Sequence, residues 1–123
     1  MEESNYGMPS TPSQVIGVIQ FKYYEMHSLH EKILTTYLNG RYDLRMARQL
    51  LASMFTFVQF IRNYKKLKDD KALQKSFDFL ETFMRTRYNS ENKDIKPIIL
   101  FDLMADCTNA YEKLGLADLE YKV

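Results

Sequence analysis

Glycine and proline are scarce in this chain of 123 residues, at four and three, and tryptophan is absent. β-Sandwiches and β-barrels need many turns, so this scarcity argues against both. The single cysteine, Cys107, excludes an internal disulfide and favours a reducing compartment. A formal net charge of only +1 gives no overall attraction to nucleic acid or to acidic substrates.

Targeting and membrane signals are missing as well. The N-terminal residues MEESNYGMPSTPSQ contain no basic region followed by an apolar core, so we expect no signal peptide and a cytoplasmic location. The most apolar run, Leu50–Ile61, has 12 residues. A membrane-spanning helix needs about 20. The run is therefore predicted to be buried in a protein core.

Apolar residues make up 46% of the chain, enough for the core of one domain. Residues 1–10 are polar and are predicted to form a flexible arm, and residues 11–123 a single helical domain. Thr11 as N-cap and Pro12 in the first helical position predict a helix that runs to about Leu38, where Asn39 and Gly40 end it.

The stretch Asp43–Leu67 is predicted to be the central helix, with Asp43 as its N-cap. At helical spacing it carries two apolar stripes, and a helix that is apolar on most sides is surrounded by other elements. The first stripe contains Ala47, Leu51, Met54, Val58 and Ile61, and the second contains Leu50, Phe57, Phe60 and Tyr64.

Two further helices are expected. Asp69 and Asp70 open the third, which carries apolar residues at 73, 77, 80, 84 and 88. No glycine or proline separates it from the second, so separate helices and one kinked helix both stay open. Asp94 is predicted to cap the fourth, and Gly115 to end it. Short links between four helices predict an all-α, up-down antiparallel four-helix bundle.

Catalysis and metal binding are not expected. His27, His30 and Glu31 share one helical face, but no second histidine-bearing helix faces them, and we predict no metal and no cofactor. Cys107 lies on the apolar stripe of the fourth helix, where thiols are usually inert. Without convergent acid–base groups, the chain is predicted not to be an enzyme.

Phenylalanine, tyrosine and methionine are more abundant than a four-helix core requires. A groove lined by such residues accepts amphipathic helices, which predicts a protein-binding module. The same surplus also fits an overfilled core or the interface of a homodimer or self-associating structural subunit. The candidate partner-binding residues are Phe21, Tyr24, Phe55, Phe79 and Phe83.

Binding to nucleic acid is the alternative function. Arg41, Arg45 and Arg48 share one face at the start of the second helix, and Lys65 and Lys66 lie at its far end with Arg62 and Lys68. Such residues can contact phosphates. They also suit a solvated face and the negative end of a helix dipole.

The order of motifs resembles that of the flagellin-specific export chaperones, the FliS family. The similar features are Tyr6 in the arm, the Ser10-Thr11-Pro12 helix start, the Asn39-Gly40 turn, the aromatic segment Phe77–Arg85, and Ala110-Tyr111. Ile19–Lys22 replaces the family's Leu-Tyr-Asp-Gly motif. The resemblance implies a cytoplasmic helical bundle that keeps an aggregation-prone helical segment of a partner soluble before export.

Overall fold

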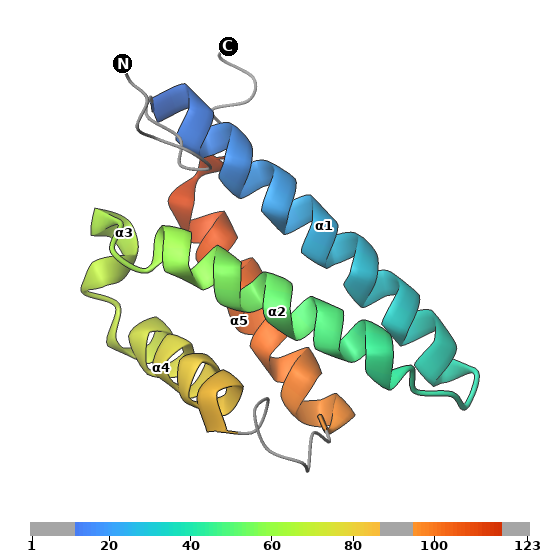
Figure 1. Ribbon diagram of the computed structural model, residues 1–123. Helices are drawn as coiled ribbons and strands as arrows, with labels where there is room; N and C mark the ends of the chain where they lie inside the picture. Colours follow the sequence, from blue (N-terminus) through green and yellow to red (C-terminus); the bar gives the residue numbers. More distant parts are fainter. Residues whose placement is uncertain (1–11, 87–94, 117–123) are drawn as a thin grey trace.

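The computed structural model describes residues 12–86 and 95–116, and within these ranges the chain is helical and contains no strand. The predicted arm and the predicted N-cap Thr11 lie outside them. No helix in this part combines the length and the apolar character of a membrane span. The all-α prediction is therefore confirmed, and Figure 1 shows the five helices: α1 (Pro12–Leu38), α2 (Leu44–Ile61), α3 (Lys65–Lys68), α4 (Lys71–Thr86) and α5 (Pro97–Leu114).

The turn between α1 and α2 forms where the sequence predicts it. Gly40 has a φ of 84°, in the left-handed region that favours glycine. The N–H of Arg41 donates to the carbonyl of Thr36 at 2.9 Å, which closes the end of α1. The Asp43 side chain then accepts a hydrogen bond from the N–H of Met46 at 3.0 Å and caps α2.

α2 ends at Ile61, so the prediction that the second helix continues to Leu67 is wrong. Tyr64 has an extended backbone, with φ −66° and ψ 143°. The Gln74 side-chain amide donates to the carbonyl oxygens of Arg62 and Leu67, at 2.8 and 3.0 Å. The first bond satisfies a carbonyl group at the end of α2, and the second adds to the bond that the Leu67 carbonyl accepts from the N–H of Asp70 at 3.0 Å. A side chain from α4 therefore stabilises the break, and the second and third predicted helices are separate.

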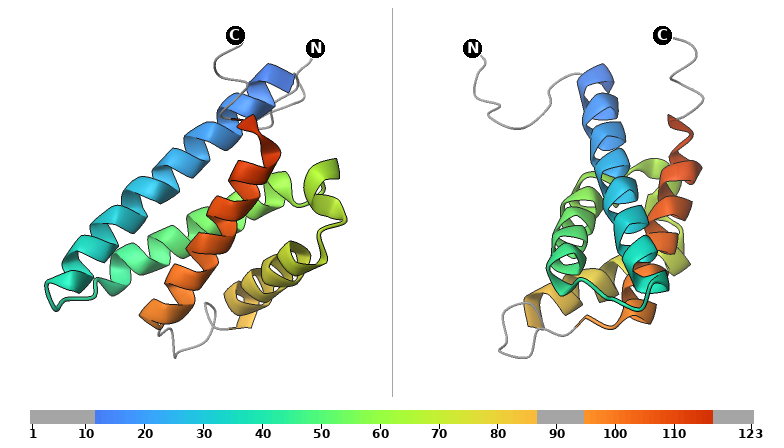
Figure 2. Two further views of the ribbon diagram at one scale, coloured as in Figure 1. Left: turned by 180° about the vertical axis from the view of Figure 1, so that it is seen from behind. Right: turned by 90° about the vertical axis from the view of Figure 1, so that its right-hand side faces the viewer.

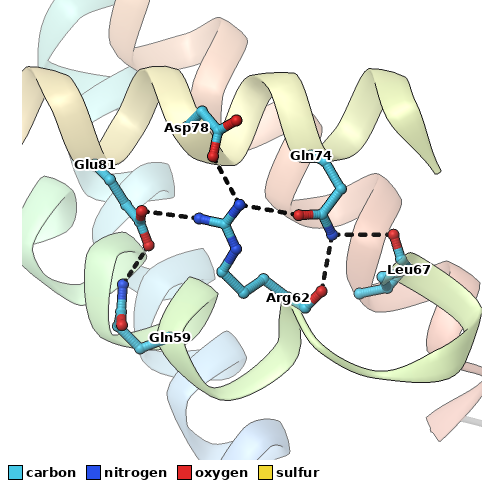
Figure 3. A network of polar contacts seen from close by, with 6 residues as sticks. All are labelled: Gln59, Arg62, Leu67, Gln74, Asp78 and Glu81. Atoms are coloured by element: carbon cyan, nitrogen blue, oxygen red, sulfur yellow. Dashed lines mark hydrogen bonds and ion pairs between the residues drawn. The ribbon is translucent and has the colours of Figure 1, made fainter. Parts of the chain in front are cut away.

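Arg62 ties the end of α2 to α4 (Figure 3). Its guanidinium contacts the carboxylates of Asp78 and Glu81 at 2.7 and 2.8 Å and donates to the Gln74 oxygen at 2.9 Å. Gln59 donates to Glu81 on the same side. The hydrogen bond to Asp78 is the main reason why the pKa of Arg62 is raised above its usual value. Paired charges thus join the end of α2 to α4.

We expect Arg62→Met to lower the free energy of unfolding by about 1–3 kcal/mol, because charge-assisted hydrogen bonds are lost and the partly buried Glu81 loses its cation. Urea denaturation measures the change. Lys65→Met is the matched control, since Lys65 is exposed and makes no ion pair within the described ranges. An equal loss in both variants would contradict the role given to Arg62.

α5 begins later than predicted. Lys96 occupies its N-cap position and Pro97 its first helical position, where a proline loses no hydrogen bond. The assignment of Asp94 as cap is therefore wrong, and Asp94 itself lies outside the described residues. Gly115, with a φ of 70°, ends the helix as predicted.

α2 lies at the centre of the fold and packs against α1, α4 and α5 (Figures 1 and 2). Its stripe residues are buried as predicted, except that Phe60 and Tyr64 are only partly buried. The regular up-down four-helix bundle stays a prediction. The short helix α3 lies between α2 and α4 in the chain, and α2 and α5 cross instead of lying parallel (Figure 2). The buried residues of α2 are Ala47, Leu50, Leu51, Met54, Phe57, Val58 and Ile61.

Val58 is fully buried, and we expect Val58→Asp to prevent folding, because an unpaired carboxylate in an apolar core costs several kcal/mol. Circular dichroism and thermal melting measure the effect. Thr56→Asp is the control, since Thr56 is exposed on the same helix. A folded Val58→Asp variant with an unchanged melting temperature would contradict the central position of α2.

Candidate partner-binding surface

The structure distributes the five predicted partner-binding aromatics over different surfaces. Phe83 is buried and belongs to the core, whereas Phe79 is 49% exposed. Phe55 is partly buried. Phe21 is 70% exposed and Tyr24 is half-exposed, both on α1. The five residues therefore do not line one groove.

Phe55 and Phe79 are separated by α4. Phe55 lies one helical turn before Gln59, whose side chain reaches Glu81, so Phe55 is on the side of α2 that faces α4. Phe79 lies one turn after Ser76, which donates a hydrogen bond to Asp106 of α5. Phe79 is therefore on the opposite side of α4, next to α5.

α4 and α5 are antiparallel neighbours. Asp70 caps the start of α4 by accepting from the N–H of Leu73 at 3.1 Å, and it also pairs with Lys113 near the end of α5. Further along, Ser76 contacts Asp106. Sequence numbers rise on one helix as they fall on the other, which defines the relative direction. The Asp70–Lys113 pair holds one end of this helix pair together.

An open groove of about 440 Å³, the α4–α5 groove, runs between these helices. Leu103 is buried in its floor, and the Phe79 ring lies 6.0 Å from the ring of Phe83. Ile98, which is 69% exposed, lies on α5 next to a lining residue. The groove is lined by Ala72, Lys75, Ser76, Phe79, Ile99, Asp102, Leu103 and Asp106. It therefore combines an apolar floor with charged rims.

A second group of aromatic residues forms ring contacts between α1 and α5. The rings of Tyr23 and Tyr111 stack at 3.9 Å, with an interplanar angle of 2°. The Tyr23 hydroxyl lies 3.2 Å from the hydroxyl of Thr108. Tyr24 touches Tyr111 from outside, edge to face. Nothing in the spacing of Tyr23 and Tyr111 in the sequence identifies them as a stacked pair.

A second groove lies between α1 and α5 and has a volume of about 470 Å³. His30 and Leu34 line it from α1, and Phe101 and Glu112 line it from α5. The rings of His30 and Phe101 are nearly perpendicular, with their centroids 5.5 Å apart. Burial is the main cause that lowers the pKa of His30, and His27 adds to it.

His27 and Cys107, two of the residues considered for metal binding and catalysis, have different surroundings. His27 contacts Glu31 at 3.2 Å, with both side chains largely exposed. No group of three or more potential metal ligands occurs in residues 12–86 and 95–116. Cys107 is buried, and burial raises the pKa of its thiol, which disfavours a reactive thiolate.

The predicted phosphate contacts lie at opposite ends of α2. Arg41 and Arg45 are exposed at its start, and Arg48 is partly buried. Lys65 and Lys66 follow its end, about 27 Å away for 18 residues at about 1.5 Å each. The Lys66 ammonium also donates to the carbonyl of Leu114, at 3.4 Å. Nucleic-acid binding stays a prediction, and the residues predicted to contact phosphates do not share one end of α2.

Comparisons of the chain with family models, with curated proteins and with solved structures give no match. The resemblance to the flagellin-specific export chaperones therefore stays a hypothesis that depends on the motifs quoted above. The proposed function therefore depends on the geometry of the α4–α5 groove.

We expect the stability of the protein to fall as the pH drops below about 6.5, and His30 to contribute to this fall. The folded state lowers the pKa of His30, so the unfolded chain binds its proton more readily, and acid favours unfolding. Urea denaturation at pH 7 and pH 5 tests this in His30→Gln. The variant should lose less stability than the wild type over that interval. Identical losses would contradict the contribution of His30.

Proposed function

We propose that this protein is a non-catalytic protein-binding module that holds an amphipathic helical segment of a partner in the α4–α5 groove. The observation that carries the proposal is the half-exposed Phe79 beside the apolar floor of that groove. Ile98, which is exposed near the start of α5, lies one helical turn before the lining residue Asp102. Exposed aromatic anchors at the centre of a patch are typical of the residues that contribute most to binding.

The shape of the surface favours a helical occupant. Two antiparallel helices leave a trough between them, and a third helix fits such a trough through side chains at positions i, i+3, i+4 and i+7. Helix bundles commonly bind helices in this way. The proposed scaffold is the up-down bundle expected from the sequence, with the groove on its α4–α5 side.

The wider role that we propose is that of a cytoplasmic export chaperone or adaptor. The motif order in the sequence and the exposed aromatic surface both support it. In that role the groove covers the apolar stripe of a partner segment that would otherwise aggregate. Affinity then depends on apolar anchors more than on sequence, which suits a binding site built from phenylalanine and isoleucine.

Self-association through the same groove is the main alternative. A twofold interface uses the same patch on both subunits, so a dimer would cover Phe79 with its own copy. Sedimentation velocity at several concentrations separates the two cases. A monomer at concentrations at which the peptide binds supports the proposal, and a dimer that Phe79→Ser dissociates contradicts it.

We expect Phe79→Ser to weaken binding of an amphipathic helical peptide of about five turns about five- to thirtyfold, because it removes the apolar anchor. Fluorescence anisotropy with a labelled peptide measures the affinity. The loss of folding stability should be near 1 kcal/mol or less, because Phe79 is half-exposed already.

Phe21→Ser is the matched control for this experiment. Phe21 is more exposed than Phe79 and lies on α1, away from the α4–α5 groove. The control variant should therefore bind as the wild type does. If Phe21→Ser weakens binding and Phe79→Ser does not, the partner lies on α1 and the proposal is wrong.

A further inference from the structure

The two rims of the α4–α5 groove carry opposite charges. Lys75 lines the α4 side, and the exposed Lys71 lies one turn before it on the same helical face. Asp102 and Asp106 line the α5 side. Asp102 is exposed, and Asp106 accepts a hydrogen bond from Ser76. A helix in the groove would thus have a basic wall on one side and an acidic wall on the other.

These rim charges are not neutralised by neighbouring charges. Within residues 12–86 and 95–116, Lys71, Lys75, Asp102 and Asp106 take part in no ion pair. The contrast is the α2–α4 contact, where Arg62 pairs with carboxylates of α4 (Figure 3). Charges that face an apolar groove without a partner are free to pair with charges of a bound segment.

We propose that the rims fix the direction in which an amphipathic helix binds. The occupant is a partner helix whose apolar stripe has Lys or Arg along one flank and Asp or Glu along the other. Its basic flank lies along α5, next to Asp102 and Asp106, and its acidic flank lies along α4, next to Lys71 and Lys75. This inference rests on the proposed function, because it assigns the chemistry of the partner at the same groove.

Geometry explains why charge sets direction here. Turning a helix end over end in the groove keeps its apolar stripe on the floor but exchanges its two flanks. One direction then places opposite charges together on both rims, and the reverse direction places like charges together. Like charges in contact are unfavourable, whereas opposite charges attract. A groove with two rims of the same sign would not discriminate in this way.

A second copy of the chain suits this groove less well than a helix does. A twofold interface would bring the same concave surface against the groove. Two facing grooves leave space between them, whereas the convex surface of a helix fills one. A helical segment of a partner is therefore a better occupant of the groove than a second copy of the chain.

The test uses the full chain and two designed peptides of equal composition, each of about five helical turns. Both carry a leucine stripe, with lysine on one flank and glutamate on the other, and the flanks are exchanged between the peptides. A nitroxide at the peptide N-terminus broadens amide signals at the nearer end of α4, either around Ala72 or around Phe83. We expect the two peptides to bind in opposite directions. At low salt, the affinity of each peptide in its preferred direction should exceed its affinity in the reverse direction by about fivefold or more.

The decisive variant is the double exchange Lys75→Asp with Asp102→Lys, which leaves the net charge unchanged and, with Lys71 and Asp106 still in place, makes each rim neutral. It should abolish the directional preference of both peptides, and added salt should weaken the preference in the wild type. The matched control exchanges the exposed ion pair of α1, with Lys22→Glu and Glu25→Lys. This control should keep the wild-type directions. Circular dichroism establishes that all variants are folded.

The outcomes separate this inference from the proposed function. Peptides that compete for the Phe79 groove but bind in both directions equally, or keep their direction in the Lys75–Asp102 exchange, overturn the inference alone. Peptides that do not bind, or that bind with the same affinity to Phe79→Ser, overturn the proposed function and the inference together. A dimer that buries the groove overturns both as well.

Discussion

The break after Ile61 is the constraint on which the rest of the structure depends. α2 is apolar on two sides, so its exposure to water would be costly and other helices must cover it. α4 can cover it only if the chain turns back, and the turn leaves carbonyl groups without helical partners. The side-chain amide of Gln74 donates hydrogen bonds to the carbonyl oxygens of Arg62 and Leu67. Gln74 belongs to α4, the helix whose position depends on the break. α4 therefore helps to stabilise the break that places it.

The two sides of α4 differ in how their charges are used. Toward α2, Arg62 joins Asp78 and Glu81, so the polar groups there are satisfied inside the protein. Toward α5, the contact is fixed at one end by Asp70 and Lys113. The groove charges beyond it form no ion pair within residues 12–86 and 95–116. A closed contact stabilises the fold, whereas an open contact with an apolar floor is suited to binding. This difference supports the proposal that the partner binds on the α5 side of α4.

Arg62 also shows why a cluster of basic residues in a sequence does not by itself indicate phosphate binding. In the sequence it belongs to the group at the end of α2, with Lys65, Lys66 and Lys68. In the fold its guanidinium is held by carboxylates of α4, and Lys66 reaches the last carbonyl group of α5. Contacts of this kind use cations for stability, and they leave fewer of them for a nucleic acid.

The sequence by itself determined the helices, most of their ends and the central place of α2. Asp43, Gly40 and Gly115 act through local backbone geometry, and apolar stripes follow helical periodicity, so both can be recognised within a short window. It also singled out Phe79 as a candidate partner-binding residue. Only the tertiary structure decided where α2 ends and that Phe55 and Phe79 lie on opposite sides of α4. Those outcomes depend on contacts such as Gln74 with Arg62 and Ser76 with Asp106, which join residues that are far apart in the chain and carry no local signal.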